Sequence, residues 1–343
     1  MSTSPALVVG GGISGLACTV ELARAGVQVL VRDRGRRLGG RMASRRLRDT
    51  GTRWDGRVVD YGASYFTAKD ADFCAQVQHW IDEGLVQEWT DAFAVWETDA
   101  MSGVRQGPIR YRAPGGLRTL VEKLARDAVA ADDRVSLEFP TEVQSITVRN
   151  GRLQVDGADE FDSIAICAPG PQAARMLETQ LQLPLVQQIA WEPVIAVWMV
   201  FDSRTWAEVD GVFVNGDPIL TWIADDGRRR GDDAPVLVAH VHPLHAVHHL
   251  QDPQAVIPEA IAAVRRILNI ADYPDYAQAH RWSLARPISA LPEPFALLTE
   301  VDRPELTGLQ VGFAGDAFAA GPRIEAAWLS GRALGRALSS VLL

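Results

Sequence analysis

The chain has 343 residues, of which 47% are hydrophobic and 22% are charged, and its formal net charge at pH 7 is −9. This length exceeds what one compact domain usually needs, so we expect two domains or one elaborated domain. The acidic balance, without a dominant basic surface, argues against nucleic-acid binding. Neither an apolar run of the ~20 residues that a membrane span requires nor a signal-peptide pattern is found, which predicts a cytoplasmic protein without a membrane partner.

The first predicted elements form a dinucleotide-binding unit. An apolar strand at residues 6–9 leads into Gly10-x-Gly12-x-x-Gly15, an amphipathic helix and a second apolar strand that ends at Asp33. Gly10 permits a tight turn, Gly12 lets the backbone approach a pyrophosphate, and Gly15 lets the helix pack closely on the strand. Asp33 follows Gly15 by 18 residues, where a carboxylate can accept hydrogen bonds from an adenosine ribose. This unit alone leaves NAD and FAD both open.

The next segments alternate loops with short elements. The stretch GRRLGGRMASRR (residues 35–46) predicts a second phosphate- or ring-contacting loop with Arg41 as its charged member, although a surface arginine is the alternative interpretation. A short strand and turn are expected over residues 58–70 and a helix over 71–85. The alternation in residues 88–100 predicts a strand that leads into a loop.

The middle of the chain begins with an amphipathic helix after Pro-Gly-Gly, within residues 111–129. Residues 134–157 predict a β meander with a hairpin turn at Asn150-Gly151. A buried strand, a Pro-Gly stop and a helix follow over residues 160–177.

Residues 191–241 are predicted to be rich in strands and hold many of the tryptophans. Within them, DDGRRRGDDAP (residues 225–235) is interpreted as a charged surface loop in preference to a phosphate-binding one. The histidine-rich stretch HVHPLHAVHHL (residues 240–250) has no clean ligand spacing and is interrupted by Pro243, so we expect a solvated loop and helix start and no metal site. Cys18, Cys74 and Cys167 lack CxxC spacing and predict neither a disulfide framework nor zinc.

The end of the chain carries a second glycine turn. A helix is expected at about 253–268 and a strand at 277–287. A further apolar strand is followed directly by Gly315-Asp316, and a helix is expected to start near Pro322. A carboxylate at this place can accept hydrogen bonds from a ribityl chain, which NAD lacks, and a helix N-terminus can stabilise a reduced flavin. This second site favours resident FAD over NAD.

An ordered set of motifs over essentially the whole chain resembles the FAD-dependent amine-oxidase superfamily and, within it, the renalase family, above all its bacterial branch. The motifs are GGGISGL, LGGRMASRR, DYGASYFTAKD, AICAPGPQA, AHRWSLARP and FAGDAFAAGPRIEAAWLSG. The resemblance implies an α/β fold of the p-hydroxybenzoate hydroxylase type with noncovalent FAD. It implies a discontinuous FAD-binding Rossmann-like domain of residues 1–67, 108–178 and 288–343, and a strand-rich α+β substrate domain of residues 68–107 and 179–287.

The family pattern also implies particular cofactor contacts. The glycine turn holds the pyrophosphate, the backbone at Val143 faces the adenine, and Asp316 contacts the ribityl chain. The full set of implied cofactor-binding residues is Gly10, Gly12, Ile13, Ser14, Gly15, Asp33, Arg34, Gly40, Arg41, Met42, Gly62, Ala63, Val143, Gly315, Asp316, Arg323, Ile324 and Glu325.

The implied activity is oxidation of the aberrant 2- and 6-dihydro isomers of NAD(P)H, with hydride passing to flavin N5, O₂ giving hydrogen peroxide, and NAD(P)⁺ released as a repaired metabolite. His240, His280 and Trp282 are the candidate catalytic residues that stack on the nicotinamide and bind its carboxamide. The alternative for them is a core tryptophan and satisfied strand histidines. Asp226 and Ser64 depart from the family pattern in the expected substrate pocket.

Three alternative functions differ in how well they fit the sequence. An amine oxidase usually needs a lysine near the flavin, and lysine occurs only at Lys69 and Lys123, so the sequence after residue 123 has none. A carotenoid-type desaturase generally has a longer chain and an apolar membrane-binding surface. A non-catalytic flavin-binding regulator is not separated from an enzyme by sequence. The chain is expected to act as a monomer on a small molecule and O₂.

Overall fold

Two units, each made of discontinuous segments, share the chain. The computed structural model describes residues 5–131, 133–298, 300–301, 303–318 and 321–342. Unit 1 comprises Met1–Gly40, Leu120–Trp191 and Arg286–Leu343, and unit 2 comprises Arg41–Thr119 and Glu192–Ala285.

A six-stranded sheet forms the centre of unit 1, with strand order β17-β18-β11-β1-β2-β7. Strand β1 (Ala6–Val9) pairs in parallel with β2 (Val29–Arg32) on one side and with β11 (Ser163–Ile166) on the other. Every residue of β1 and β11 is buried, as expected for central strands of a parallel sheet. The remaining strands of the sheet are β7 (Val135–Glu138), β17 (Ala296–Leu298) and β18 (Gln310–Phe313).

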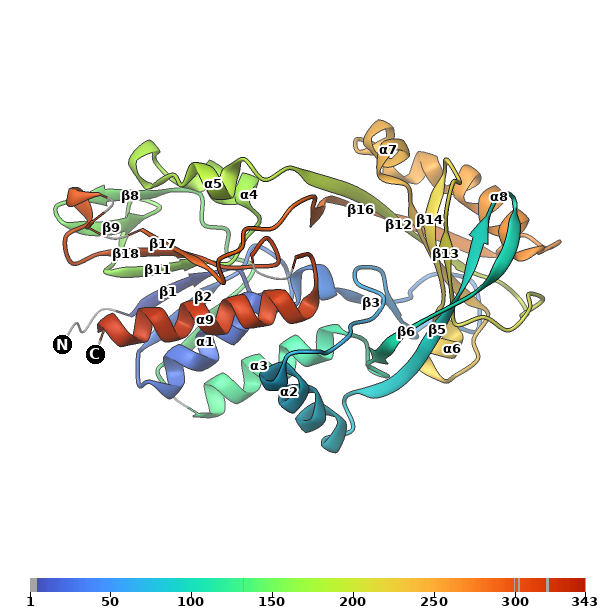
Figure 1. Ribbon diagram of the computed structural model, residues 1–343, viewed down its shortest axis with the longest axis horizontal. Coiled ribbons are helices and arrows are strands. Elements are labelled where there is room, and N and C mark those ends of the chain that lie inside the picture. The colour runs from blue at the N-terminus through green and yellow to red at the C-terminus, as the bar shows by residue number, and fades with distance from the viewer. Residues whose placement is uncertain (1–4, 132, 299, 302, 319–320, 343) are drawn as a thin grey trace. The chain divides into compact units, whose positions relative to one another are not determined.

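Two helices from opposite parts of the sequence lie side by side in unit 1 (Figure 1). These are α1 (Ile13–Arg24), in blue, and α9 (Ile324–Leu342), in red. A Cβ atom added at Gly331 would stand 2.0 Å from the carbonyl oxygen of Ser14, so the missing side chain lets the two helix backbones touch. Glu21 on α1 accepts hydrogen bonds from Arg332 Nε at 2.8 Å and Arg336 Nε at 2.9 Å on α9.

The predicted meander over 134–157 is wrong at its first strand. Strand β7 joins the parallel sheet beside β2, because its apolar residues Val135 and Leu137 pack with the core around β2. The turn at Asn150-Gly151 is confirmed: both residues have positive φ, and the turn joins β8 (Ile146–Arg149) to β9 (Arg152–Val155). Other elements of this unit are α3 (Arg118–Ala131), β10 (Asp159–Phe161), α4 (Gly170–Met176), η2 (Thr179–Leu181), α5 (Pro184–Gln187) and η5 (Pro304–Leu306).

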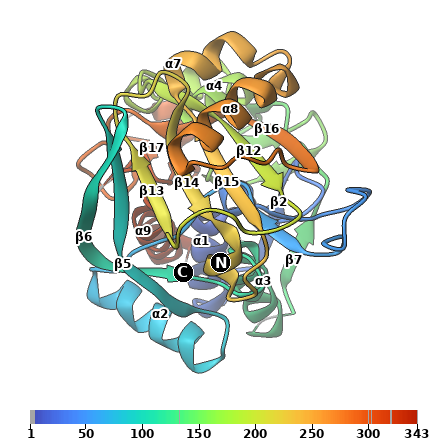
Figure 2. The same ribbon diagram turned by 90° about the vertical axis from the view of Figure 1, so that its right-hand side faces the viewer.

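A seven-stranded sheet forms unit 2, with strand order β16-β12-β15-β14-β13-β5-β6. Helix α8 (Ile257–Leu268) covers one face of it (Figure 2), where Val264 and Ile267 pack against Val197 and Leu237. The strands are β5 (Gln87–Glu97), β6 (Ala100–Arg112), β12 (Trp191–Val200), β13 (Gly211–Val214), β14 (Leu220–Asp225), β15 (Val236–Val241) and β16 (Tyr276–Pro287). The smaller elements are η1 (Gly40–Met42), β3 (Ser44–Arg46), β4 (Val58–Asp60), α2 (Ala71–Asp82), α6 (Asp226–Arg230), α7 (Pro243–Ala246), η3 (Val247–His249) and η4 (Pro253–Val256).

The loop expected after residue 100 is the long edge strand β6. A tight turn at Thr98 and Asp99, both with positive φ, folds β6 back on β5. The first nine residues of β6 are exposed, so this part of the strand has no buried face and lacks the apolar alternation by which a strand is recognised.

The segment 41–67, assigned from the family resemblance to the FAD-binding domain, falls within unit 2. There Leu47 and Val59 pack with Trp198 of β12 in one apolar cluster. Within the described residues, none of the helices is both long and apolar enough to span a membrane.

Candidate cofactor and substrate site

The first glycine turn of unit 1 has the geometry that a bound pyrophosphate requires. A Cβ atom at Gly15 would stand 1.8 Å from the carbonyl oxygen of Gly10, so only glycine allows this approach of helix to strand. A Cβ atom at Gly12 would meet no atom within 4 Å, so open space lies beside the backbone there. Gly12 is the N-cap of α1 and has no side chain to accept hydrogen bonds from the first-turn N–H groups, which leaves them for an anion.

Ser14 supplies an independent test of cofactor fit. Its Oγ is buried, and in the described part of the chain it has no hydrogen-bond partner. A buried hydroxyl without a partner is costly, and a phosphate oxygen at the glycine turn would satisfy it. Ile13 beside it is buried as well. The residues of this turn therefore fit a dinucleotide.

Asp33 binds the glycine turn itself. Its two carboxylate oxygens accept hydrogen bonds from the backbone N–H groups of Gly11 and Gly35, each at 2.6 Å. Each oxygen keeps further lone pairs with which it could accept a ribose hydroxyl. The neighbouring Arg34 is mostly exposed and lies 3.9 Å from Glu142. Val143 is buried in the apolar cluster that includes Leu7 and Val9 of β1. Their roles toward the adenosine half stay predictions.

The second glycine turn of unit 1 follows β18. Gly315 has φ +155°, and its N–H donates to Ser330 Oγ on α9 at 3.0 Å. Asp316 and Glu325 are both buried. Helix α9 begins at Ile324, with the Arg323 carbonyl accepting from Ala327 N–H at 3.1 Å, so the helix starts slightly later than predicted. The strand, turn and helix thus follow in the predicted order.

The loop around Arg41 packs against the loop around Gly62 within unit 2. The Arg41 carbonyl accepts a hydrogen bond from Ala63 N–H at 2.9 Å, and a Cβ atom at Gly62 would stand 2.1 Å from that oxygen. The Arg41 guanidinium donates to the Ala285 carbonyl at 3.0 Å. Gly40 and Met42 complete the 3-10 helix η1, and Met42 is buried. The loops around Arg41 and Gly62, which are separate motifs in the sequence, are therefore in direct contact in the structure.

The candidate substrate residues on β16 share one face, as the period of two predicts. The rings of His280 and Trp282 lie 4.7 Å apart, and both contact Tyr61. The Tyr61 and Trp282 rings are stacked, with centroids 5.5 Å apart and planes inclined by 21°. Trp282 Nε1 donates to the Tyr61 carbonyl at 2.8 Å. Tyr61, which the sequence did not single out, completes this aromatic cluster of Tyr61, His280 and Trp282.

Burial, together with the nearby charges of Arg45 and Arg281, lowers the pKa of His280 to about 4. The imidazole is therefore neutral at physiological pH. A neutral imidazole has one donor and one acceptor nitrogen, and so it can bind a carboxamide.

His240 on β15 belongs to the same face of the seven-stranded sheet. It alternates with Leu237 and Ala239, which pack under α8, and so it projects on the opposite side together with Val238. In the sheet it is opposite Ala196 of β12 and Trp222 of β14. Because β12 separates β15 from β16, His240 lies about 10 Å from the strand of the aromatic cluster.

Ser64 is a buried structural contact in this unit. Its hydroxyl accepts from Trp222 Nε1 at 3.0 Å, and its carbonyl accepts from the Arg229 guanidinium at 2.8 Å.

The interpretation of residues 225–235 as a charged surface loop is wrong. Residues Asp226–Arg230 form helix α6, and Asp226 and Arg229 are buried. The Asp226 carboxylate binds Arg57 Nη1 at 2.5 Å, pairs with Arg229, and lies 3.3 Å from Arg230 Nε. Burial alone would raise the pKa of Asp226, but the three guanidinium groups lower it well below the ordinary value. The partner Arg57 is far away in sequence, and no local pattern reveals it.

Comparison with known families agrees with this geometry. The fold and the glycine turns are those of a dinucleotide-binding oxidoreductase. Residues 8–81 match the family model of the NAD(P)-binding Rossmann-like domain. Residues 81–337 match the model of the flavin containing amine oxidoreductases. This second match spans most of the chain, and the chain belongs to that family. The predicted superfamily, fold class and noncovalent FAD are thereby confirmed, and the protein is a flavin-dependent oxidoreductase.

Solved structures share the fold over nearly their whole length. One is a protein from Exiguobacterium sp. 255-15 assigned as a protoporphyrinogen oxidase, with a TM-score of 0.78, 16% identity and 99% of each chain covered. Another is cyclohexylamine oxidase from Brevibacterium oxydans IH-35A, with a TM-score of 0.71, 14% identity and 99% of each chain covered. A triple mutant of putrescine oxidase has a TM-score of 0.69 and 15% identity, with 98% of this chain and 99% of that chain covered. Identities this low indicate a common fold and leave the substrate open.

Proposed function

We propose that this flavoprotein is a renalase-type oxidase that converts the 2- and 6-dihydro isomers of NAD(P)H to NAD(P)⁺. The observation that best supports this is the aromatic cluster of Tyr61, His280 and Trp282 with its neutral imidazole. FAD held at the Gly10–Gly15 turn would supply the hydride acceptor and the reduction of O₂ to hydrogen peroxide. The protein then has only to bind the dihydronicotinamide, orient it and exclude water.

The cluster suits a flat ring that carries an amide. Trp282 uses its N–H on the Tyr61 carbonyl, so its contribution to a ligand is the face or edge of the indole ring. Neutral His280 keeps a donor and an acceptor for the carboxamide. His240, on the same sheet face, is the second candidate hydrogen-bonding group.

The charges on this sheet face favour an anionic substrate. Arg110 is only 5% exposed, its guanidinium lies 4.2 Å from the centre of the Phe93 ring, and within the described residues its Nη1 has no hydrogen-bond partner. Phe93 contacts Trp222, which is the cross-strand neighbour of His240. Arg45 lies 4.9 Å from the centre of the Trp198 ring. A buried guanidinium attracts the phosphates of a dinucleotide and repels an ammonium group.

The lysine content points in the same direction. Lysine occurs only at Lys69 and Lys123, both outside the seven strands of the unit 2 sheet. An amine oxidase that relies on a lysine near the flavin has no candidate on this sheet.

Anaerobic reduction of the bound flavin tests the proposal. The fully loaded protein is mixed with 2-dihydroNAD, 6-dihydroNAD, ordinary NADH and a panel of small amines, and bleaching of the visible flavin band is followed by stopped flow. We expect fast bleaching by an isomeric dihydronucleotide and slow bleaching by NADH. Reduction by amines alone would indicate an amine oxidase. A loaded flavin that none of these compounds reduces would indicate a flavin-binding protein without turnover.

Substitutions in the aromatic cluster test whether it contributes to the rate of flavin reduction. Trp282→Ala and His280→Gln should slow reduction by the isomer by more than about tenfold, since both remove contacts that orient the ring. Their FAD content should equal that of the wild type. Equal reduction rates in wild type and both variants would contradict a role for the cluster.

A further inference from the structure

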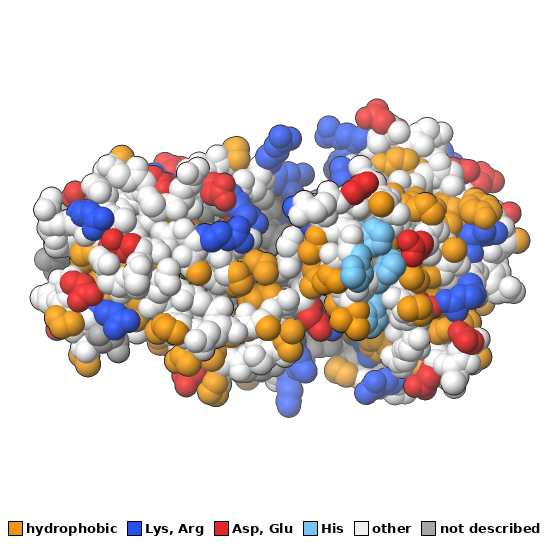
Figure 3. Space-filling model, turned by 90° about the horizontal axis from the view of Figure 1, so that it is seen from above, with side chains coloured by type: hydrophobic (Ala, Val, Ile, Leu, Met, Phe, Trp, Pro, Cys, Tyr) orange, Lys and Arg blue, Asp and Glu red, His pale blue; other side chains and the backbone are white. Residues whose placement is uncertain are grey.

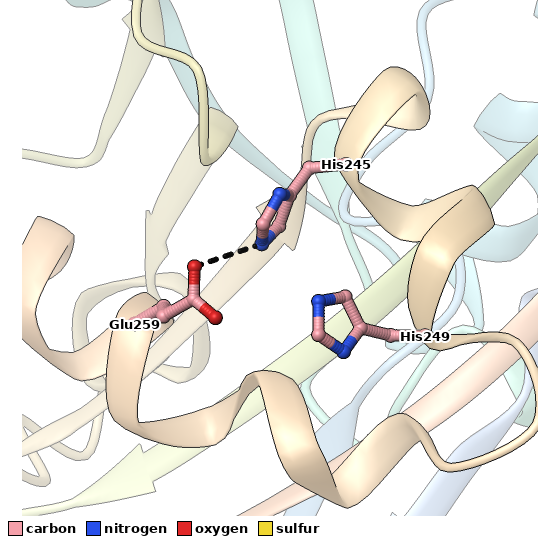
Figure 4. A group of neighbouring side chains, drawn as sticks. All are labelled: His245, His249 and Glu259. Atoms are coloured by element: carbon pink, nitrogen blue, oxygen red, sulfur yellow. Dashed lines mark ion pairs between the residues drawn. The ribbon is translucent and has the colours of Figure 1, made fainter.

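A patch of histidines stands on the surface of unit 2 (Figure 3), apart from the aromatic cluster. It belongs to the short helices α7 and η3, which follow β15. Figure 4 shows that His245 and His249 point toward Glu259, which lies in the first turn of α8. The spacing of the histidines alone predicts no metal site, and Glu259, which completes the group, lies on another helix.

The three side chains are close enough to bind one ion. One ligand atom from each of His245, His249 and Glu259 lies within 4.8 Å of the other two. His245 Nε2 stands 3.1 Å from Glu259 Oε2, and the two imidazole rings are 4.9 Å apart. In a tetrahedral zinc site, bonds of about 2.0–2.1 Å separate neighbouring ligand atoms by about 3.3 Å. Side-chain rotations that shorten the longest of these separations by up to about 1.5 Å would complete this spacing.

The backbone that carries these ligands is held in place. The His242 side chain accepts a hydrogen bond from Leu244 N–H at 3.2 Å at the start of α7. Ala246 on α7 and Ala260 on α8 are fully buried in the core of unit 2. Gln254 bonds the backbone of Ala279 on β16 through both ends of its amide. The backbone that carries the three ligands is therefore ordered before a metal ion binds.

We propose that His245, His249 and Glu259 form a binding site for one divalent transition-metal ion such as Zn²⁺. Two imidazoles and a carboxylate suit zinc and its neighbours copper, nickel and cobalt. Mg²⁺ and Ca²⁺ prefer six or more oxygen ligands and are not expected to bind. Glu259 has a side chain 47% exposed and His245 one 21% exposed, so water can fill the fourth position.

The simpler interpretation is an ordinary ion pair between His245 and Glu259. The two interpretations differ at His249, which an ion pair does not need and a metal site does. His248 is the matched control, because it is an exposed histidine in the same η3 turn and lies outside the three-residue cluster.

Isothermal titration of ZnCl₂ into the tag-free, chelator-treated, FAD-loaded protein tests the site. The wild type should bind one Zn²⁺ per chain and gain thermal stability from it. His249→Ala and Glu259→Gln should weaken binding by more than about tenfold, whereas His248→Ala should bind like the wild type. Without metal, His249→Ala should melt at the wild-type temperature, which separates ligand loss from misfolding. MgCl₂ should give no saturable binding.

Two results would overturn the proposal. One is the absence of saturable binding by the wild type at Zn²⁺ concentrations up to the order of 0.1 mM. The other is equal weakening by His248→Ala and His249→Ala, which would mean that zinc binds loosely to exposed imidazoles. Neither result depends on catalytic turnover.

Discussion

Single glycines in the first turn have opposite physical roles. At Gly15 a side chain would collide with the Gly10 carbonyl, 1.8 Å away, so glycine is needed for the protein to fold tightly there. At Gly12 a side chain would collide with nothing, so the protein alone could accommodate one. The free space at Gly12 is needed only when a pyrophosphate approaches the backbone.

Alanine substitutions should separate these roles. Gly15→Ala should lower the free energy of unfolding by about 1–3 kcal/mol or more through overpacking, with loss of bound flavin. Gly12→Ala should leave the stability of the cofactor-free protein unchanged within about 0.5 kcal/mol and weaken FAD binding. Chemical unfolding of the cofactor-free proteins, together with FAD titration, measures both. Equal destabilisation by the two variants would contradict this division.

The buried carboxylate of Asp226 illustrates a different residue-scale effect. Asp226→Asn would leave Arg57, Arg229 and Arg230 buried with less negative charge. We expect a loss of about 3–5 kcal/mol in unfolding free energy. The exposed Asp233→Asn is the control, expected to change stability by no more than about 0.5 kcal/mol. Urea denaturation measures both, and a near-neutral Asp226→Asn would show that this network does not support the fold.

His280 gives the stability of the protein a pH dependence. Its pKa is about 4 in the folded protein against an ordinary value of 6.5, so the unfolded chain binds more protons between these pH values. The stability that neutral His280 contributes is present above pH 6.5 and is lost progressively as the pH falls toward 4. The wild type should therefore lose more stability between pH 7 and pH 5 than His280→Gln, which cannot be protonated there. Urea denaturation at the two pH values provides the check, and parallel losses would argue against a buried neutral imidazole.

Among the elements, α1 and α9 depend most closely on each other. Gly331 and Gly335 let α9 lie against the backbone of α1 at Ser14 and Cys18. Glu21 binds Arg332 and Arg336 across the same contact. Burial raises the pKa of Glu21, but hydrogen bonds and charge from these two arginines lower it overall. The helix that carries the cofactor turn is thus positioned by the helix that follows the second glycine turn.

Gly331→Ala tests this contact. Its Cβ would stand 2.0 Å from the Ser14 carbonyl, so the helices must separate, at a cost of about 1–3 kcal/mol in unfolding free energy. Ser340→Ala on the exposed side of α9 should change it by no more than about 0.5 kcal/mol. Thermal and urea unfolding of both variants measure the difference. Wild-type stability in Gly331→Ala would show that α9 can shift without consequence.

Elements with a local signal could be predicted from sequence, whereas those set by distant partners could not. The glycine turns, Asp33 and the shared face of His280 and Trp282 follow from spacing along a single strand or turn. The first nine residues of β6 are all exposed, and β7 takes its place in the sheet from pairing with β2. Tyr61 in the aromatic cluster and Glu259 in the histidine patch come from segments far from their partners, and only the folded chain brings them together.

At the scale of the whole molecule, both units are assembled from segments that are separated in the sequence. Unit 1 contains residues from the first forty and from the final stretch of the chain, including all of α9. Its sheet places β1 between β2 and β11, and β18 beside β11. Neither unit can be produced by cutting the chain once.

Truncation should therefore abolish cofactor binding. A chain that ends at Pro322 lacks α9 and leaves the apolar residues of α1 without Leu334 and Leu338, which share their cluster. We expect it to purify without flavin or to aggregate. Among the described residues, a chain that ends at Ser340 removes only the exposed Val341 and the partly buried Leu342, and it should retain FAD. Flavin content after gel filtration is the measurement, and full FAD occupancy in the shorter chain would contradict this dependence.

The pairing of α1 with α9 also has a consequence for how the protein is made. During translation, the turn at Gly10–Gly15 leaves the ribosome long before residues 324–342 exist. Throughout that interval the side of α1 that packs against Leu334 and Leu338 of α9 stays uncovered, and exposed apolar surface of this kind promotes aggregation. Stable flavin insertion should therefore wait until residues 324–342 have left the ribosome and α9 can pack against α1.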